Sequence, residues 1–147
     1  MGGMRDVTIG EAARESGVKV TTIRFYEERG LLQAPPRSAG GQRLYGAQEV
    51  ARLRFIRHAR DLGFDMAALA DLLDLAGHPD APCAGADRLA EARLADVRRR
   101  ITALRALEGE LERMLAACRH GTTERCAVLE SLADHALCAG PHERGPT

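Results

Sequence analysis

The chain has 147 residues, and its 21 Lys and Arg balance its 21 Asp and Glu. This length allows one compact domain, or a small head joined to a long helical element, but not two full-sized domains. Aromatic residues make up 3% of the chain, Trp is absent, and Ala, Leu, Glu and Arg dominate, which favours a mostly α fold. No apolar run approaches the ~18 residues of a membrane-spanning helix, and residues 1–6 lack the apolar run of a signal peptide. We therefore expect a cytoplasmic protein with no membrane partner.

The charges are unevenly distributed along the chain. Residues 1–62 carry 11 basic and 7 acidic side chains, whereas residues 63–147 carry 10 basic and 14 acidic ones. A basic front suits a polyanion-binding head, and an acidic back suits a tail with another role. An uneven solvated surface is the alternative interpretation.

The first 30 residues contain the signals of two short helices. The segment 8–11, Thr-Ile-Gly-Glu, has the form of a capping box, so a helix should begin after Thr8 and end at Gly17. A second helix is predicted over 23–29, capped by Thr21 or Thr22. Two short helices joined by a tight glycine turn indicate a helix-turn-helix.

The next segment changes character. Residues 31–45 hold two prolines and two glycines between the apolar pairs 31–32 and 44–45, which predicts a small β-hairpin, or wing. Apolar residues at helical spacing then predict a helix over 50–59 and a shorter one over 66–75.

A long helix is predicted over about 86–117, which contains no Pro and one Gly. Its apolar side chains recur at alternating three- and four-residue steps and form a coiled-coil seam, which we call the seam: Leu94, Val97, Ile101, Leu104, Leu111 and Leu115. Glu108 occupies the one step that breaks this series. A helix of about 32 residues would be roughly 48 Å long, so we expect it to pair with the same helix of a second chain. Folding back on its own head is the alternative.

The helix-turn-helix predicts which side chains meet DNA, because the start of its second helix enters the major groove. The candidates are Thr21, Thr22, Arg24 and Tyr26 from this helix, Arg37, Arg43 and Tyr45 from the wing, and Arg57 from the following helix, which also carries Arg52, Arg54 and Arg60. Arg24 can bind a phosphate or a guanine edge bidentately. We expect Ile23, Phe25 and Leu44 in the core.

Four groups of residues in the head form a recognisable pattern: the run Thr22-Ile23-Arg24-Phe25-Tyr26-Glu27, then Gly30-Leu31-Leu32, then Pro35, Arg37 and Arg43-Leu44-Tyr45, and finally Leu53-Arg54-Phe55-Ile56. With this pattern the head resembles the MerR family of bacterial regulators. The resemblance implies a winged helix-turn-helix dimer on a promoter with an overlong spacer. When the inducer binds, such a dimer bends and untwists the DNA so that RNA polymerase can use it. Arg24, Tyr26, Arg43 and Tyr45 match positions that contact DNA in the family.

The four cysteines should stay reduced in the cytosol, which favours metal binding or redox sensing over disulfides. Cys118 and Cys126 bracket a short loop after the long helix, whereas Cys83 lies 35 residues before Cys118, roughly 50 Å along a straight helix. One chain therefore does not bring the three together. If two helices pair antiparallel, Cys83 of one chain meets Cys118 and Cys126 of the other, and the dimer holds two equivalent three-thiolate sites.

The resemblance supports this site, because Cys83, Cys118 and Cys126 match the ligand positions of the MerR metalloregulators. In the copper(I) sensors the position that matches Cys83 is similar to a serine position, which leaves two thiolates. The resemblance therefore implies that a chain with cysteine at this position binds a divalent ion. Three thiolates suit Hg²⁺, Cd²⁺ and Pb²⁺, while Zn²⁺ normally takes a fourth ligand such as His120 or water. The loop resembles cadmium, lead and zinc sensors, and a mercury(II) sensor is the alternative. Cys138 is a possible extra ligand.

These predictions divide the chain into a DNA-binding head (1–76), a linker and dimerisation helix (77–117), a metal-binding loop with a short helix (118–138) and a disordered tail (139–147). An enzyme is not expected, because the sequence offers no phosphate loop, acid pair or oxyanion turn. An iron–sulfur sensor is not expected either, because it would need four clustered cysteines after the long helix, and only Cys118, Cys126 and Cys138 follow it, widely spaced. A metal buffer that binds DNA nonspecifically is the remaining alternative.

Overall fold

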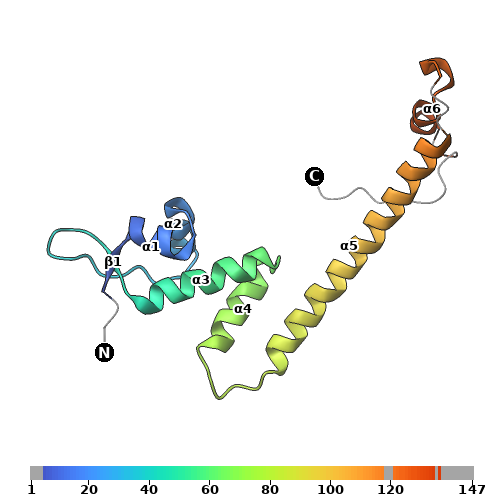
Figure 1. The fold of residues 1–147 in the computed structure, drawn as a ribbon. Coiled ribbons are helices and arrows are strands. Elements are labelled where there is room, and N and C mark those ends of the chain that lie inside the picture. Colours follow the sequence, from blue (N-terminus) through green and yellow to red (C-terminus); the bar gives the residue numbers. More distant parts are fainter. Residues whose placement is uncertain (1–4, 118–120, 135, 137–147) are drawn as a thin grey trace. The chain divides into compact units, whose positions relative to one another are not determined.

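The computed structural model describes residues 5–117, 121–134 and 136. The mostly helical class is confirmed (Figure 1). The elements are β1 (Val7–Thr8), α1 (Ile9–Ser16), α2 (Val20–Glu28), β2 (Leu44–Tyr45), α3 (Ala47–Asp61), α4 (Met66–Ala76), α5 (Ala84–Ala117), the 3₁₀ helix η1 (Thr123–Arg125) and α6 (Ala127–Ala133). No helix in the described ranges has the length and apolarity needed to cross a membrane.

The predicted capping box starts α1. The Thr8 hydroxyl accepts a hydrogen bond from the Glu11 amide at 3.3 Å, and the Thr8 amide donates to the Glu11 carboxylate at 3.0 Å. Two amides that the helix itself leaves without partners are thereby satisfied. The helix ends, as predicted, at Gly17, whose φ of 73° suits glycine.

The second helix begins earlier than predicted. Lys19 is the N-cap of α2, no side chain caps it, and the Lys19 carbonyl already accepts from the Ile23 amide at 2.9 Å. The prediction that Thr21 or Thr22 caps this helix was therefore wrong, because both lie inside its first turn.

The predicted hairpin is wrong in its strand pairing. β2 pairs antiparallel with β1, with Thr8 opposite Leu44, and the wing itself contributes one isolated bridge between Arg37 and Arg43. Leu31 and Leu32 do not form a strand, because their amides donate to the Tyr26 carbonyl at the end of α2. The prolines that follow them lack the N–H that a strand ladder needs.

The core of the head collects side chains from α1, α2, the wing, α3 and α4. The predicted spacing on α3 is confirmed, because Val50, Leu53, Ile56 and Ala59 are all buried there. Ile23 is buried as predicted and Leu44 is half-buried. Phe25 was wrongly predicted as core: it is 39% exposed, and Tyr26 is buried in its place.

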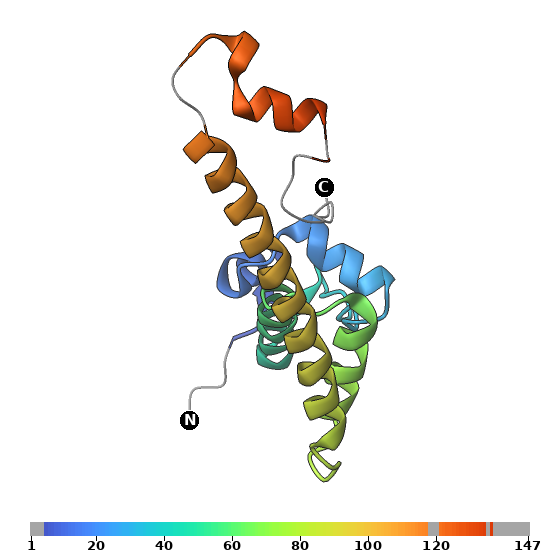
Figure 2. The same ribbon diagram turned by 90° about the vertical axis from the view of Figure 1, so that its right-hand side faces the viewer.

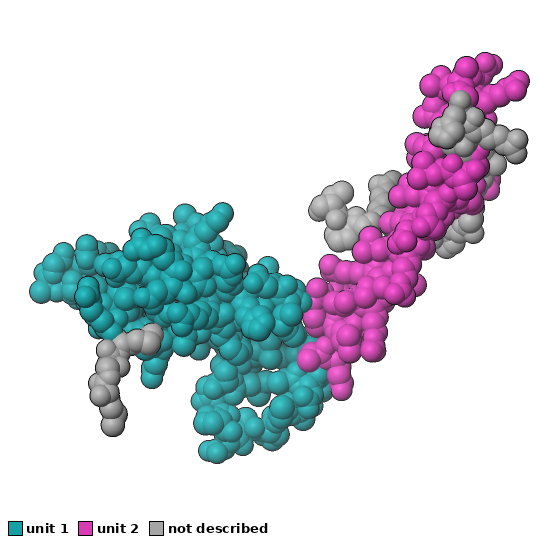
Figure 3. Space-filling view, in the orientation of Figure 1, with its two compact units in different colours: residues 1–89 teal, residues 90–147 magenta. Residues whose placement is uncertain are grey.

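The chain separates into two compact units, residues 1–89 and 90–147, shown in teal and magenta in Figure 3. The boundary falls inside α5, which starts two residues before the predicted position and runs as one uninterrupted helix of 34 residues (Figures 1 and 2).

Within the second unit, α6 packs on the last turns of α5. Glu110, Met114 and Ser131 are buried, and the Arg113 guanidinium donates to the Ser131 hydroxyl at 3.4 Å. The predicted tail, residues 139–147, lies outside the described residues.

Candidate DNA-binding surface and metal-binding cysteines

The exposed face of α2 carries part of the predicted DNA-binding set. Thr21 and Arg24 are exposed and Thr22 is half-buried. Phe25 shares this face, where the Arg29 guanidinium lies 5.0 Å from the centre of its ring. Tyr26 points inward and is 7% exposed. The helix therefore offers hydroxyls, a guanidinium and an aromatic ring to a partner.

Glu27 joins the wing to α2. Its carboxylate accepts a hydrogen bond from the Tyr45 hydroxyl at 2.5 Å and pairs with the Arg43 guanidinium at 2.9 Å. The Glu27 side chain is 6% exposed, so its carboxylate and the contact with Tyr45 are largely shielded from water, whereas the Arg43 side chain is 40% exposed. Burial and the Glu27 carboxylate together raise the pKa of Tyr45 to about 12. Tyr45 is fully buried, so the structure gives it a positioning role for the wing.

A cleft of about 390 Å³ opens between α2, the wing and the start of α1. Three predicted DNA-binding arginines line it: Arg24, Arg37 and Arg43. Arg37 also donates to the Gly41 carbonyl at 3.4 Å, which holds the wing tip. Three guanidinium groups around one opening suit an anionic ligand such as a phosphate backbone.

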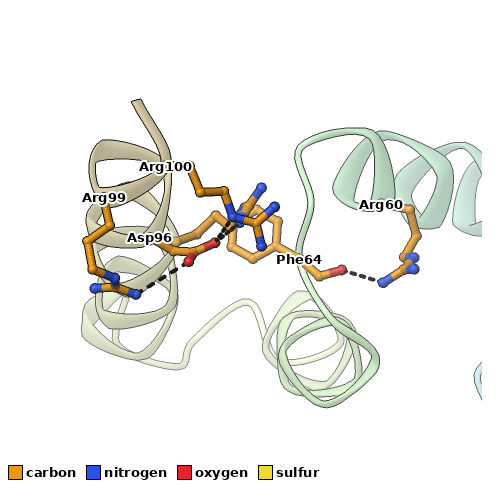
Figure 4. Close-up of polar contacts among 6 residues, drawn as sticks. Arg60, Phe64, Asp96, Arg99 and Arg100 are labelled. Atoms are coloured by element: carbon orange, nitrogen blue, oxygen red, sulfur yellow. Dashed lines mark hydrogen bonds and ion pairs between the residues drawn. The ribbon is translucent and has the colours of Figure 1, made fainter. Parts of the chain in front are cut away.

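The arginines of α3 do not join this cleft. Arg57 donates to the Gly17 carbonyl at the end of α1, and its Nε lies 3.6 Å from an Asp61 carboxylate oxygen. Arg52 and Arg54 donate to the carbonyls of Leu31 and Glu15 at 2.6 and 3.2 Å. Arg60 donates to the Phe64 carbonyl at 2.7 Å (Figure 4). These four side chains satisfy backbone carbonyls at the ends of helices and in loops, a role that the sequence analysis missed.

Two of the predicted metal ligands lie in the described residues. Cys83 is exposed, immediately precedes α5, and its Sγ lies 3.7 Å from an Asp87 carboxylate oxygen. Cys126 is half-buried at the residue before α6. Cys118, His120 and Cys138 lie outside the described residues. Within the described ranges, no three His, Cys, Asp or Glu side chains gather closely enough to hold a metal ion.

The helices α1 and α2, the wing held against α2 by Glu27, and the basic cleft between them define a winged helix-turn-helix protein. Family models support this class over most of the chain. The model for the MerR HTH family regulatory protein matches residues 7–76, and the model described as MerR, DNA binding matches residues 50–114.

Individual relatives agree with these models. The mercuric resistance operon regulatory protein of Pseudomonas fluorescens is 39% identical over 139 residues, which cover 93% of this chain and 94% of that one. The HTH-type transcriptional regulator ZntR of Escherichia coli (strain K12) is 37% identical, covering 84% of this chain and 90% of that one. The transcription regulator PbrR691 from Ralstonia metallidurans CH34, solved in complex with lead(II), has a TM-score of 0.73 at 38% identity, covering 86% of this chain and 98% of that one.

The chain therefore belongs to the MerR family of helix-turn-helix transcription regulators, and the resemblance to its metal-responsive members is confirmed. It is a regulator and not an enzyme, as the sequence predicted.

Proposed function

We propose that this protein binds promoter DNA as a homodimer and activates transcription by distorting that DNA when a soft divalent metal ion binds. It does so in the cytoplasm, where its thiols stay reduced and RNA polymerase is present. In this proposal Thr21, Thr22 and Arg24 enter the major groove, and Arg37 and Arg43 bind the adjacent backbone. Tyr45 acts through Glu27 and Arg43. Tyr26 and Arg57 support this surface from behind, because Tyr26 packs in the core of the head and Arg57 donates to the Gly17 carbonyl at the end of α1.

The observation that carries the metal response is the position of the thiols about α5. Cys83 precedes a helix of 34 residues and Cys126 follows it, and a straight helix of that length spans about 50 Å. A second chain in antiparallel orientation would bring its Cys83 to the other end. Cys83 is exposed, so its thiol is accessible to a metal ion that is also bound by thiols of another chain.

The donor set is Cys83 from one chain with Cys118 and Cys126 from the other. Three thiolates suit a soft ion, and we propose Cd²⁺, Pb²⁺ or Zn²⁺ as the inducer, with His120 or Cys138 as an additional ligand. The relative solved in complex with lead(II) supports a soft divalent ion of this kind as the inducer. The relatives from mercuric resistance operons support the alternative, Hg²⁺.

A promoter-reporter assay in cells exposed to Zn²⁺, Cd²⁺, Pb²⁺, Hg²⁺ and Cu⁺ tests the proposal. The expected result is induction by one or more of the divalent ions, which Cys83→Ser abolishes. Induction by Cu⁺ alone would refute the divalent assignment. A footprint on one palindromic site distinguishes the regulator from a metal buffer that binds DNA nonspecifically.

A mixing experiment tests the shared site. A Cys83→Ser chain and a chain carrying Cys118→Ser and Cys126→Ser each lack a complete site as homodimers. Their heterodimer should regain one three-thiolate site, seen as thiolate-to-metal charge-transfer absorbance at about one Cd²⁺ per dimer. Tight three-sulfur binding in the Cys83→Ser homodimer would show instead that Cys83 is not the third ligand.

A further inference from the structure

One face of α5 has no partner in the described part of the second unit. Four seam residues, Ile101, Leu104, Leu111 and Leu115, are 42%, 63%, 58% and 67% exposed. The contact of α6 with α5 buries Glu110 and Met114 and leaves these residues uncovered. Large apolar side chains at heptad spacing on a bare helix face indicate that another helix covers them.

The charges along α5 indicate which helix that is. Residues 90–107 carry five Arg and two acidic residues, whereas residues 108–117 carry three Glu and one Arg. A second copy of α5 in antiparallel orientation places the basic part of one helix beside the acidic part of the other. A parallel copy would place like charges together.

The apolar residues select a register for this antiparallel pair. Leu94 then faces Leu111 of the second copy, Ile101 faces Leu104, and Ala90 faces Leu115. A shift by one heptad in one direction would place Leu111 against Asp87 and leave Leu115 outside the apolar layers, and a shift in the other direction would place Leu104 against Glu108. Of these three registers, only the first pairs Leu94 with Leu111 and Ile101 with Leu104, so that four side chains exposed in the single chain each meet another large apolar side chain.

In that register Glu108 faces Val97 of the second copy, beside Arg98. Asp96 engages the neighbouring arginines, with Arg99 at 3.4 Å and Arg100 at 3.1 Å (Figure 4). Arg98 and Glu108 are both exposed, and within the described ranges neither side chain forms an ion pair. A charged residue in an apolar seam specifies register and orientation at a cost in stability.

We propose that Glu108 of each chain forms an ion pair with Arg98 of the other, and that these two pairs select the antiparallel orientation and its register. This inference rests on the proposed homodimer. Glu108, which interrupts the apolar series of the seam, would thereby determine which ends of the two helices meet. The orientation of the helices in turn determines that Cys83 of one chain meets Cys118 and Cys126 of the other.

Charge reversal tests the pair. In a Glu108→Arg homodimer two arginines meet at each contact, and in an Arg98→Glu homodimer two glutamates meet. The dissociation constant of each homodimer should rise by about tenfold or more. When the two variants are co-expressed with different tags, both contacts of the heterodimer are complementary. Native mass spectrometry should therefore find heterodimer far above its statistical share.

Arg99→Glu is the matched control, because Arg99 lies two positions from the seam and is already engaged by Asp96. Co-expressed with Glu108→Arg it should give no enrichment of heterodimer. A single chain carrying both Glu108→Arg and Arg98→Glu should dimerise within about threefold of the wild type, which guards against a folding defect in either variant.

The outcomes separate the two proposals. A wild-type chain that stays monomeric at micromolar concentration would refute the proposed homodimer. A dimeric wild type whose Glu108→Arg and Arg98→Glu variants pair only statistically would refute the Glu108–Arg98 pair and leave the homodimer standing.

Discussion

Tyr45→Phe removes one hydroxyl from the contact that holds the wing against α2. The hydroxyl donates to the Glu27 carboxylate at 2.5 Å, and both side chains are buried, so water does not replace the lost donor. A hydrogen bond to a charged group contributes about 1.5–3 kcal/mol, and we expect a loss of this size in the free energy of unfolding. Urea denaturation followed by circular dichroism measures it.

Tyr26→Phe is the matched control for stability. Tyr26 is 7% exposed, and within the described part of the chain its hydroxyl makes no hydrogen bond and reaches solvent, because no fully buried side-chain oxygen there lacks a hydrogen-bond partner. Its removal should change the free energy of unfolding by less than about 0.5 kcal/mol. Equal losses in the two variants would refute the wing contact.

The pH dependence gives a second test of the buried setting of Tyr45 beside Glu27, because burial is the largest cause of its raised pKa and the Glu27 carboxylate adds to it. The pKa of Tyr45 is raised to about 12 from its ordinary value of 10.0, so the folded state holds this proton more tightly than the unfolded state. The resulting stability is fully present below pH 10 and is lost as the pH rises through 12, by about 3 kcal/mol at most. Tyr45→Phe should lose less stability over this interval than the wild type, and parallel pH curves would contradict the assignment.

Three further predictions follow from the head. Arg24→Ala should lower operator affinity by about 1–3 kcal/mol in a gel-shift titration without changing dimerisation, whereas Arg29→Ala, outside the cleft, should have a smaller effect; equal effects would remove Arg24 from the reading surface. Raising salt from about 50 to about 200 mM should weaken operator binding about tenfold or more, and a flat response would contradict phosphate contacts by the cleft. Gly17→Ala should destabilise the head by about 1–2 kcal/mol, because φ is 73° and the new Cβ would overlap the Arg57 guanidinium, whereas Gly10→Ala, with no atom nearer than 4.0 Å, should not destabilise it.

Local patterns made much of the head predictable. The capping box at Thr8 and Glu11 involves neighbours three residues apart, and the spacing on α3 reports its buried face directly. The prediction that Phe25 lies in the core was wrong, because Phe25 is two positions from the buried Ile23, about 200° around the helix, and the two do not share one face. Tyr26, three positions on, does share it.

The parts that sequence did not predict depend on distant pairings. Tyr45 and Glu27 are 18 residues apart and Arg54 and Glu15 are 39 apart, and no period in the sequence links either pair. The strand partner of Leu44 likewise lies near the start of the chain. For the metal site, one chain supplies only part of the ligands that we propose, so its geometry belongs to two chains.

Thr8 belongs to two structures at once. Its backbone pairs with Leu44 at the base of the wing, and its side chain caps the first turn of α1. The wing therefore does not swing away from the helices without also fraying α1. In the proposed function the wing and α1 therefore act on DNA as one rigid body, so distortion of the promoter would come from rotation of whole heads relative to each other rather than from bending within one head.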